Sequence, residues 1–192
     1  MQKTFPLAVI VKQHQSIKRV VLLAHQVNLL ALNALILVKQ SNGRAAGFGV
    51  VSTELLSFSS ELSKQMAILE DLALASVRSV SEDTKQGRSR TLLARAQKNG
   101  APLGSIIAAV QSRQQSIRSD VQTVFIRIRS AIEDAELLCR TAQIIASTAK
   151  IQAAWSLGQV EQLMDLALSF EDYANRSLFE LNQLGRTFKD SV

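Results

Sequence analysis

The chain has 192 residues, of which 47% are hydrophobic and only 5% aromatic, and it carries a formal net charge of +6. This length can bury a substantial core without metal or disulfide support, and the single cysteine, Cys139, has no internal disulfide partner. With two prolines and eight glycines, the composition favours an all-α fold over a β-sandwich. We expect Cys139, which lies in a helical stretch, to be a buried structural thiol.

The first predicted helix contains the most apolar stretch of the chain. Residues 20–38 approach the length of a membrane span, but they include four polar side chains, which are costly in lipid and tolerated in a bundle. The N-terminus lacks a secretory signal. We therefore predict a buried helix, no membrane span and a cytoplasmic protein. Two heptad-spaced tracks run along this helix: Ile17, Val21, Ala24, Asn28, Ala31, Leu35 and Val38, and Val20, Leu23, Val27, Leu30, Ala34 and Leu37.

Residues 41–49, SNGRAAGFG, interrupt the heptads with three glycines, which suit a helix end and a tight turn. The apolar spacing then resumes, so we predict a first antiparallel hairpin over residues 8–80 with its turn near 41–47. Its second track is Val51, Leu55, Phe58, Leu62, Met66, Leu69, Ala73, Val77 and Val80.

Residues 81–102 are polar and basic, and we predict a linker there because Gly87, Gly100 and Pro102 disfavour a helix. A second hairpin is expected over residues 103–190, with a turn near 156–158. Its third-helix track is Ile107, Val110, Gln114, Ile117, Val121, Val124, Ile128, Ala131, Ala135, Leu138, Ala142, Ile145, Ala149 and Gln152. Its last track is Val160, Leu163, Ala167, Phe170, Ala174, Ser177, Leu181, Leu184 and Phe188.

Two hairpins give four helices with apolar stripes to bury. We predict one all-α domain over residues 1–192, an elongated antiparallel four-helix coiled-coil bundle made of two long hairpins. The two hairpins also align with each other: VNLLALNALILVKQS and AQIIASTAKIQAAWS place Ala31 on Ala146 and Ile36 on Ile151, just before each turn. Duplication and chance similarity both remain open as explanations.

The segment over residues 26–54 resembles the hairpin tip of the bacterial methyl-accepting chemotaxis proteins. The similar runs are QVNLLALNALI on the descending arm and GFGVVSTEL on the ascending arm, at fixed spacing across the turn. The matched positions are Gln26, Asn28, Leu29, Leu30, Ala31, Leu32, Asn33, Ala34, Ile36, Gly47, Phe48, Val50, Val51 and Glu54.

The resemblance implies a non-enzymatic signalling scaffold that turns over no substrate and requires no cofactor. Its implied partners are chemoreceptors, a coupling protein or a histidine kinase, or a different effector, and a homodimer is possible. The resemblance places the partner-binding surface at the hairpin tip, for which we select Asn33, Leu35, Leu37, Val38, Gln40, Arg44, Phe48 and Val51.

The sequence departs from the family where charge is expected. Leu37 stands where the family has a glutamate, Gln40 where it has an arginine, and paired methylation sites are missing. We therefore expect altered or lost kinase control. The tip itself is still expected to be an interface, because Leu35, Leu37 and Val38 lie close to the turn, where few neighbours cover a bundle end. Cover by the second hairpin is the alternative.

Other chemistry has weaker support. His14 and His25 have no cysteine or acidic partners at metal-ligand spacing, so we predict no metal site and no catalytic residue. Trp155, beside the second turn, suits either a partner anchor or a cap on the bundle end. Two basic clusters make a nucleic-acid or anionic-surface binding protein the alternative function. They lack interleaved aromatics, and we interpret them as solvated helical faces. The clusters are Lys85, Arg88, Arg90, Arg95 and Lys98, and Arg113, Arg118, Arg127 and Arg129.

Overall fold

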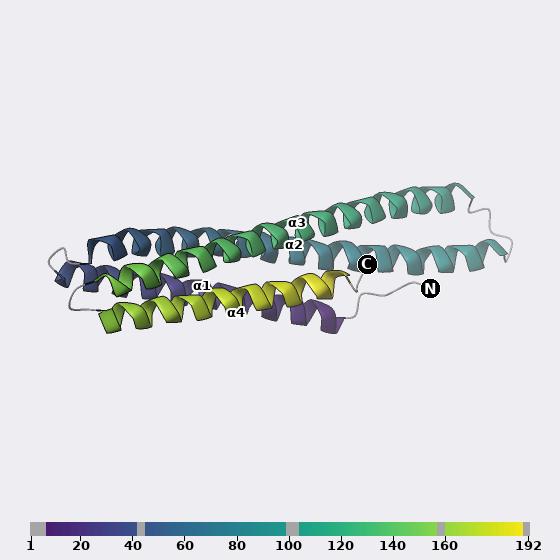
Figure 1. Cartoon of the computed structure of the whole chain (residues 1–192). Helices are drawn as coiled ribbons and strands as arrows, with labels where there is room; N and C mark the ends of the chain where they lie inside the picture. Colours follow the sequence, from purple (N-terminus) through teal and green to yellow (C-terminus); the bar gives the residue numbers. More distant parts are fainter. Residues whose placement is uncertain (1–6, 42–44, 99–103, 157–159, 190–192) are drawn as a thin grey trace.

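The computed structural model describes residues 7–41, 45–98, 104–156 and 160–189. Four helices account for almost all of them: α1 (Leu7–Gln40), α2 (Ala46–Lys98), α3 (Gly104–Ala154) and α4 (Val160–Lys189). They pack antiparallel as an elongated bundle (Figure 1). The predicted all-α four-helix bundle of two hairpins is confirmed.

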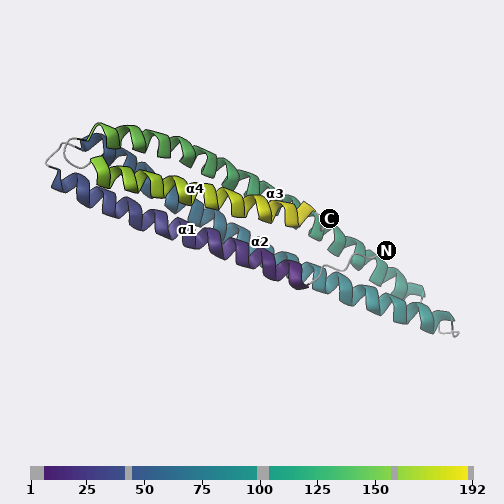
Figure 2. The same cartoon turned by 60° about the horizontal axis from the view of Figure 1, so that its bottom comes forward.

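The four helices form a ring in which each contacts two neighbours. α1 and α3 each pack against both α2 and α4, so α1 lies diagonally opposite α3. The α1–α2 and α3–α4 connections lie at one end of the molecule, which we call the tip (Figure 1). At the other end α2 and α3 continue together beyond α1 and α4 (Figure 2). At 1.5 Å per residue, the 53-residue α2 is about 30 Å longer than the 34-residue α1.

This two-helix extension replaces the linker that we expected over residues 81–102. Residues 81–98 belong to α2, and Gly87 lies inside the helix. A single glycine costs a helix only about 1 kcal/mol, and pairing with α3 offsets that cost. Among the side chains that the structure describes, none between Ser76 and Gln114 is buried. We call residues 77–113 the arm.

The core follows the predicted tracks closely in α2 and α4. In α2, seven of the predicted residues, from Val51 to Ala73, are buried, whereas Val77 and Val80 in the arm are half-buried. In α4, all the predicted residues from Leu163 to Phe188 are buried, and Val160 is exposed. The centre of the core includes an edge-to-face contact between Phe58 and Phe170, whose ring centroids are 5.8 Å apart.

The buried residues of α1 and α3 match the predicted tracks only in part. In α1 the buried set combines parts of both tracks: Ile17, Val20, Leu23, Ala24, Val27, Ala31 and Ala34. In α3 the small residues Cys139, Ala146 and Ala153 are buried, whereas Leu138 and Ile145 are half-buried. Small side chains let neighbouring helices approach closely, so they lie in the core although larger residues flank them.

The two hairpins bury equivalent positions at an offset of 115 residues. Ala24, Ala31 and Ala34 in α1 correspond to Cys139, Ala146 and Ala149 in α3, and all six are fully buried. The outward residues correspond too, since Leu22, Leu29 and Ile36 match Leu137, Ile144 and Ile151, each 48–69% exposed. The bundle therefore has an internal pseudo-twofold relation between its hairpins.

Cys139 is fully buried, as predicted for a structural thiol. Burial, with a smaller contribution from the charge of Glu136, raises the pKa of the thiol to about 12. At pH 8 only about one thiol in ten thousand is then the reactive thiolate. We expect Ellman's reagent to label the native protein far more slowly than the protein in denaturant. Rapid stoichiometric labelling of the native chain would show that Cys139 is accessible.

α1 contains a stretch, His14–Gln40, that is long and apolar enough to span a membrane, with a mean hydropathy of 2.0. A third of that window is buried inside the bundle. Its outward face carries the exposed leucine and isoleucine residues Leu22, Leu29, Leu32 and Ile36, with His25 also exposed.

Candidate partner-binding tip

Both connections at the tip begin with a serine that binds back to its own helix. The Ser41 hydroxyl donates to the carbonyl of Val38 at 2.6 Å and accepts from the amide of Ala45 at 3.1 Å. Ser156, at the equivalent place after α3, donates its hydroxyl to the carbonyl of Gln152 at 2.7 Å. Both serines are buried; Ser156 gives the Gln152 carbonyl at the end of α3 a partner, whereas the Val38 carbonyl also accepts from the Ser41 amide at 3.2 Å.

The two hairpins contact each other closely beside these turns. A Cβ atom on Gly47, the second residue of α2, would overlap the side-chain amide of Gln152 on α3. The missing side chain at Gly47 therefore lets α3 approach α2 at the tip. Gly49 is similarly close to α1, since a Cβ atom there would lie 3.2 Å from Val38 Cγ1. Gly47, a position at which the chain resembles the chemoreceptor tip, thus contributes to packing within this bundle.

The predicted tip residues divide into three groups. Phe48 and Val51 are 1% and 2% exposed, so they support the tip from inside the core. Leu35, Leu37 and Val38 are half-buried, and the last two pack against the core. Asn33 and Gln40 are exposed, and Arg44 lies outside the described residues. The bundle core therefore covers part of the predicted set, and partner binding by these residues stays a prediction.

Exposed apolar side chains also lie outside the predicted tip set, and one of them is Trp155, which the sequence left as either a partner anchor or a cap. Trp155 is 80% exposed, which excludes its role as a buried cap of the bundle end. Ile151 and Trp155 flank Gln152 on α3, and Val50 lies one turn beyond Gly47 on α2, so the three share the α2–α3 edge. We call the exposed apolar residues nearest the two turns the tip surface: Ile36, Val50, Ile151, Trp155 and Val160, with exposures of 42–80%.

A signal for the tip surface is present in the sequence. Leu22, Leu29 and Ile36 recur every seven residues, as do Leu137, Ile144 and Ile151. Each set forms an apolar stripe on the side of its helix opposite the alanine-rich core positions. The alignment of the two hairpins already placed Ile36 on Ile151, which are 54% and 58% exposed. Comparing the two stripes would have selected both residues.

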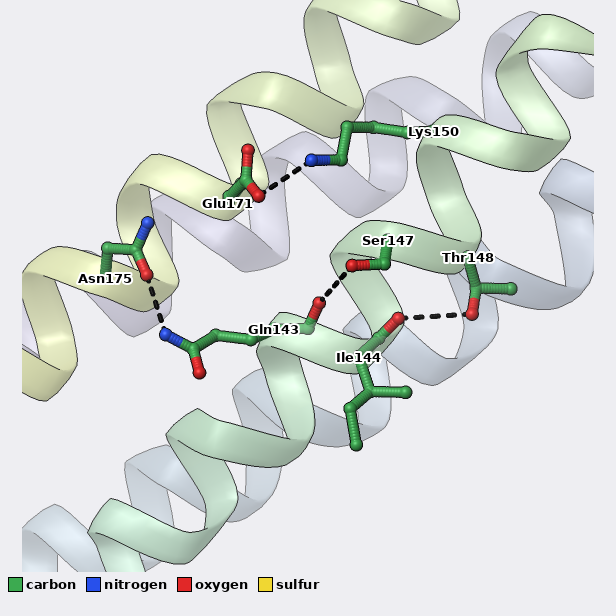
Figure 3. A network of polar contacts seen from close by, with 7 residues as sticks. All are labelled: Gln143, Ile144, Ser147, Thr148, Lys150, Glu171 and Asn175. Carbon is green, nitrogen blue, oxygen red and sulfur yellow. Dashed lines mark hydrogen bonds and ion pairs between the residues drawn. The ribbon is translucent and has the colours of Figure 1, made fainter.

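Polar contacts join α3 and α4 behind the tip (Figure 3). Lys150 Nζ lies 2.7 Å from Glu171 Oε1, and Gln143 Nε2 donates to Asn175 Oδ1 at 2.9 Å. Ser147, on the same helix as Gln143, donates its hydroxyl to a backbone carbonyl one turn earlier. The Lys150–Glu171 and Gln143–Asn175 contacts are partly or fully exposed and connect neighbouring helices. They orient α4 on α3 and form no arrangement of nucleophile and base.

The histidines and acidic residues also lie apart from any site with metal-ligand or catalytic geometry. His25 is exposed, and His14 Nδ1 lies 3.8 Å from Glu70 Oε1 at the surface. Among the described residues, no group of three or more histidine, cysteine or acidic side chains could hold a metal ion. Glu133 pairs with Arg129 at 2.9 Å as an exposed contact within α3.

Comparisons with protein families, with curated proteins and with solved structures found no match to the chain.

Proposed function

We propose that the chain is a non-enzymatic signalling scaffold that binds protein partners through its hairpin tip. The observation that carries this proposal is the tip surface, which holds apolar side chains in water at the end of the bundle. Burying a large apolar side chain stabilises a complex by about 1.5–3 kcal/mol. Val50, Ile151 and Trp155 share the α2–α3 edge, and neighbouring exposed apolar residues of this kind are typical of protein interfaces.

Tryptophan is the most informative member of the tip surface. Trp155 follows the last residue of α3, and its amide donates to the carbonyl of Ile151 at 3.3 Å, so its backbone position is fixed. A large aromatic side chain on a fixed backbone loses little conformational freedom when a partner covers it. Exposed tryptophans are therefore frequent energetic centres of interfaces.

The resemblance to the chemoreceptor hairpin tip supports the same function independently. The residues that carry it, over 26–54, form the end of α1, the first turn and the start of α2. In this chain a second hairpin occupies the place that a second receptor subunit has in that family. A coupling protein, a histidine kinase or another signalling protein is the class of partner that this resemblance suggests, and the cytoplasm the compartment.

Receptor-type kinase control is expected to be weak or absent. Leu37 and Gln40 lack the charges of the family, and the half-buried Leu37 packs against the core. Autophosphorylation of a chemotaxis kinase, reconstituted with its coupling protein and this chain, measures the effect directly. We expect no stimulation above the rate without the chain, with a chemoreceptor signalling fragment as the positive control. Stimulation comparable with that control would contradict the proposed loss.

A further inference from the structure

The arm accounts for most of the net positive charge of the chain. Residues 77–113 include seven basic and two acidic residues, a formal net charge of +5 out of +6 for the whole protein. Both acids are already paired: Glu82 Oε1 lies 3.4 Å from Arg113 Nη2, and Asp83 Oδ1 lies 3.5 Å from Arg118 Nε. These pairs join α2 to α3. The charged side chains that remain on the outer side of α2 are all basic.

The unpaired cations form a heptad-spaced stripe. The stripe positions alternate by three and four residues, and all are exposed: Arg78, Ser81, Lys85, Arg88, Leu92 and Arg95. They lie on the side of α2 away from α3, because the intervening Val80, Asp83 and Leu93 are half-buried between the two helices. Within the described residues, the cations of this stripe take part in no ion pair. We call it the basic stripe.

α4 has an exposed stripe with the same spacing and the opposite charge. Its positions are Glu161, Asp165, Leu168, Asp172, Asn175, Phe179 and Asn182, and all are exposed. We call it the acidic stripe. Among the described residues, Asp172 forms an ion pair with Arg176 alone, at 3.5 Å and 61% exposed on both sides. Such surface pairs contribute little to stability and exchange readily.

We propose that the basic stripe of one chain docks antiparallel on the acidic stripe of a second copy. One register sets Leu92 against Leu168, which are 65% and 48% exposed. The same register sets Arg88 against Asp172 and Arg95 against Asp165. It faces Lys85 and Arg78 with the neutral Asn175 and Asn182. All six positions of the basic stripe then meet a position of the acidic stripe, with no like charges opposed, and Glu161 has no counterpart in the basic stripe.

A dimer of this kind has two symmetry-related contacts, each between the arm of one chain and α4 of the other. The length of the molecule allows these two contacts to form together. Asp165 lies near the tip and Arg95 near the far end of the arm, so a twofold axis near the middle places each arm on the partner's α4. α4 and the α2 part of the arm both lie on the lower side of the molecule in Figure 1. Docking of one arm on another arm is disfavoured, because it would bring two charges of +5 together.

Charge reversal tests this arrangement in the full chain. Sedimentation equilibrium at an ionic strength of about 0.01 M, where screening acts over about 30 Å, should give wild type twice the monomer mass. The monomer mass is 21.0 kDa. The Arg88→Glu/Arg95→Glu and Asp165→Arg/Asp172→Arg variants should each be monomeric. Their equimolar mixture should recover the dimer, because each reversed stripe then faces its opposite.

A matched control keeps the result specific. Arg127→Glu/Arg140→Glu lowers the net charge by the same amount as Arg88→Glu/Arg95→Glu. Its two positions are exposed on α3 outside both stripes, so this variant should dimerise like wild type. All substituted side chains are exposed, and circular dichroism verifies that each variant is folded. Wild type at 21.0 kDa, or a mixture that stays monomeric, would overturn the proposal. Binding of the arm to duplex DNA or anionic vesicles without dimer formation would also overturn the proposal, because the basic stripe would then bind a different polyanion.

Discussion

Phe170→Ala is expected to lower the free energy of unfolding by about 3–5 kcal/mol, the largest single-residue effect that we predict for the fold. Phe170 is fully buried on α4 and meets Phe58 of α2 edge to face, at an interplanar angle of 76°. α2 and α4 are diagonal helices of the ring, so this contact crosses the centre of the bundle. Truncation removes both the aromatic contact and the volume that separates the two helices.

Urea unfolding followed by circular dichroism measures this loss. Phe179→Ala is the matched control, because Phe179 lies on the same helix but is 61% exposed. We expect the control to shift stability by less than about 1 kcal/mol. Equal effects of the two substitutions would mean that α4 does not bury the face that the structure shows.

The fold was predictable where polar residues mark one side of a helix. In α4, charged and polar residues separate the positions from Leu163 to Phe188, so only one face can be buried, and the predicted track is the observed core. α1 has few polar residues to exclude a face. The sequence therefore predicted two adjacent tracks for α1, and the core takes only part of each: Val20 is buried, whereas Val21 is 39% exposed.

Residue size supplied the information that polarity could not. Ala31 and Ala34 in α1, like Ala146 and Ala149 in α3, are fully buried, whereas Leu29 and Ile144 point outward. A pattern based on hydrophobicity alone ranks leucine above alanine for burial. The arm was missed for a related reason: composition disfavours a packed core over 81–98, but a helix needs only one partner helix and its own hydrogen bonds to persist.

The sequence predicted the location of the candidate site at the hairpin tip, but it predicted only some of the residues that are exposed there. Both turns lie at the tip, close to the predicted segments. Phe48 and Val51 are buried because α2 begins at Ala46, so the resemblance identified residues that shape the tip from within. Ile151 and Trp155 belong to the second hairpin, to which the resemblance does not extend.

Partner binding through the tip predicts that exposed tip residues can be changed with a large loss of binding and little loss of stability. Trp155 is 80% exposed, so Trp155→Ala should leave the unfolding free energy within about 0.5 kcal/mol of wild type. Truncation of an interface tryptophan typically costs a complex about 2 kcal/mol or more, which is roughly a thirtyfold weaker affinity. A fold defect therefore cannot account for the loss.

Photo-crosslinking in cells tests the central claim most directly. A photoreactive phenylalanine analogue at position 155 reports on the tip, and the same group at position 137 reports on the middle of α3, where Leu137 is 64% exposed. The two positions are about 27 Å apart along the helix. We predict a discrete adduct with another protein from position 155 and none from position 137. No adduct at 155, adducts of equal yield at both positions, or an adduct only with a second copy of the chain would contradict the tip as the partner-binding surface.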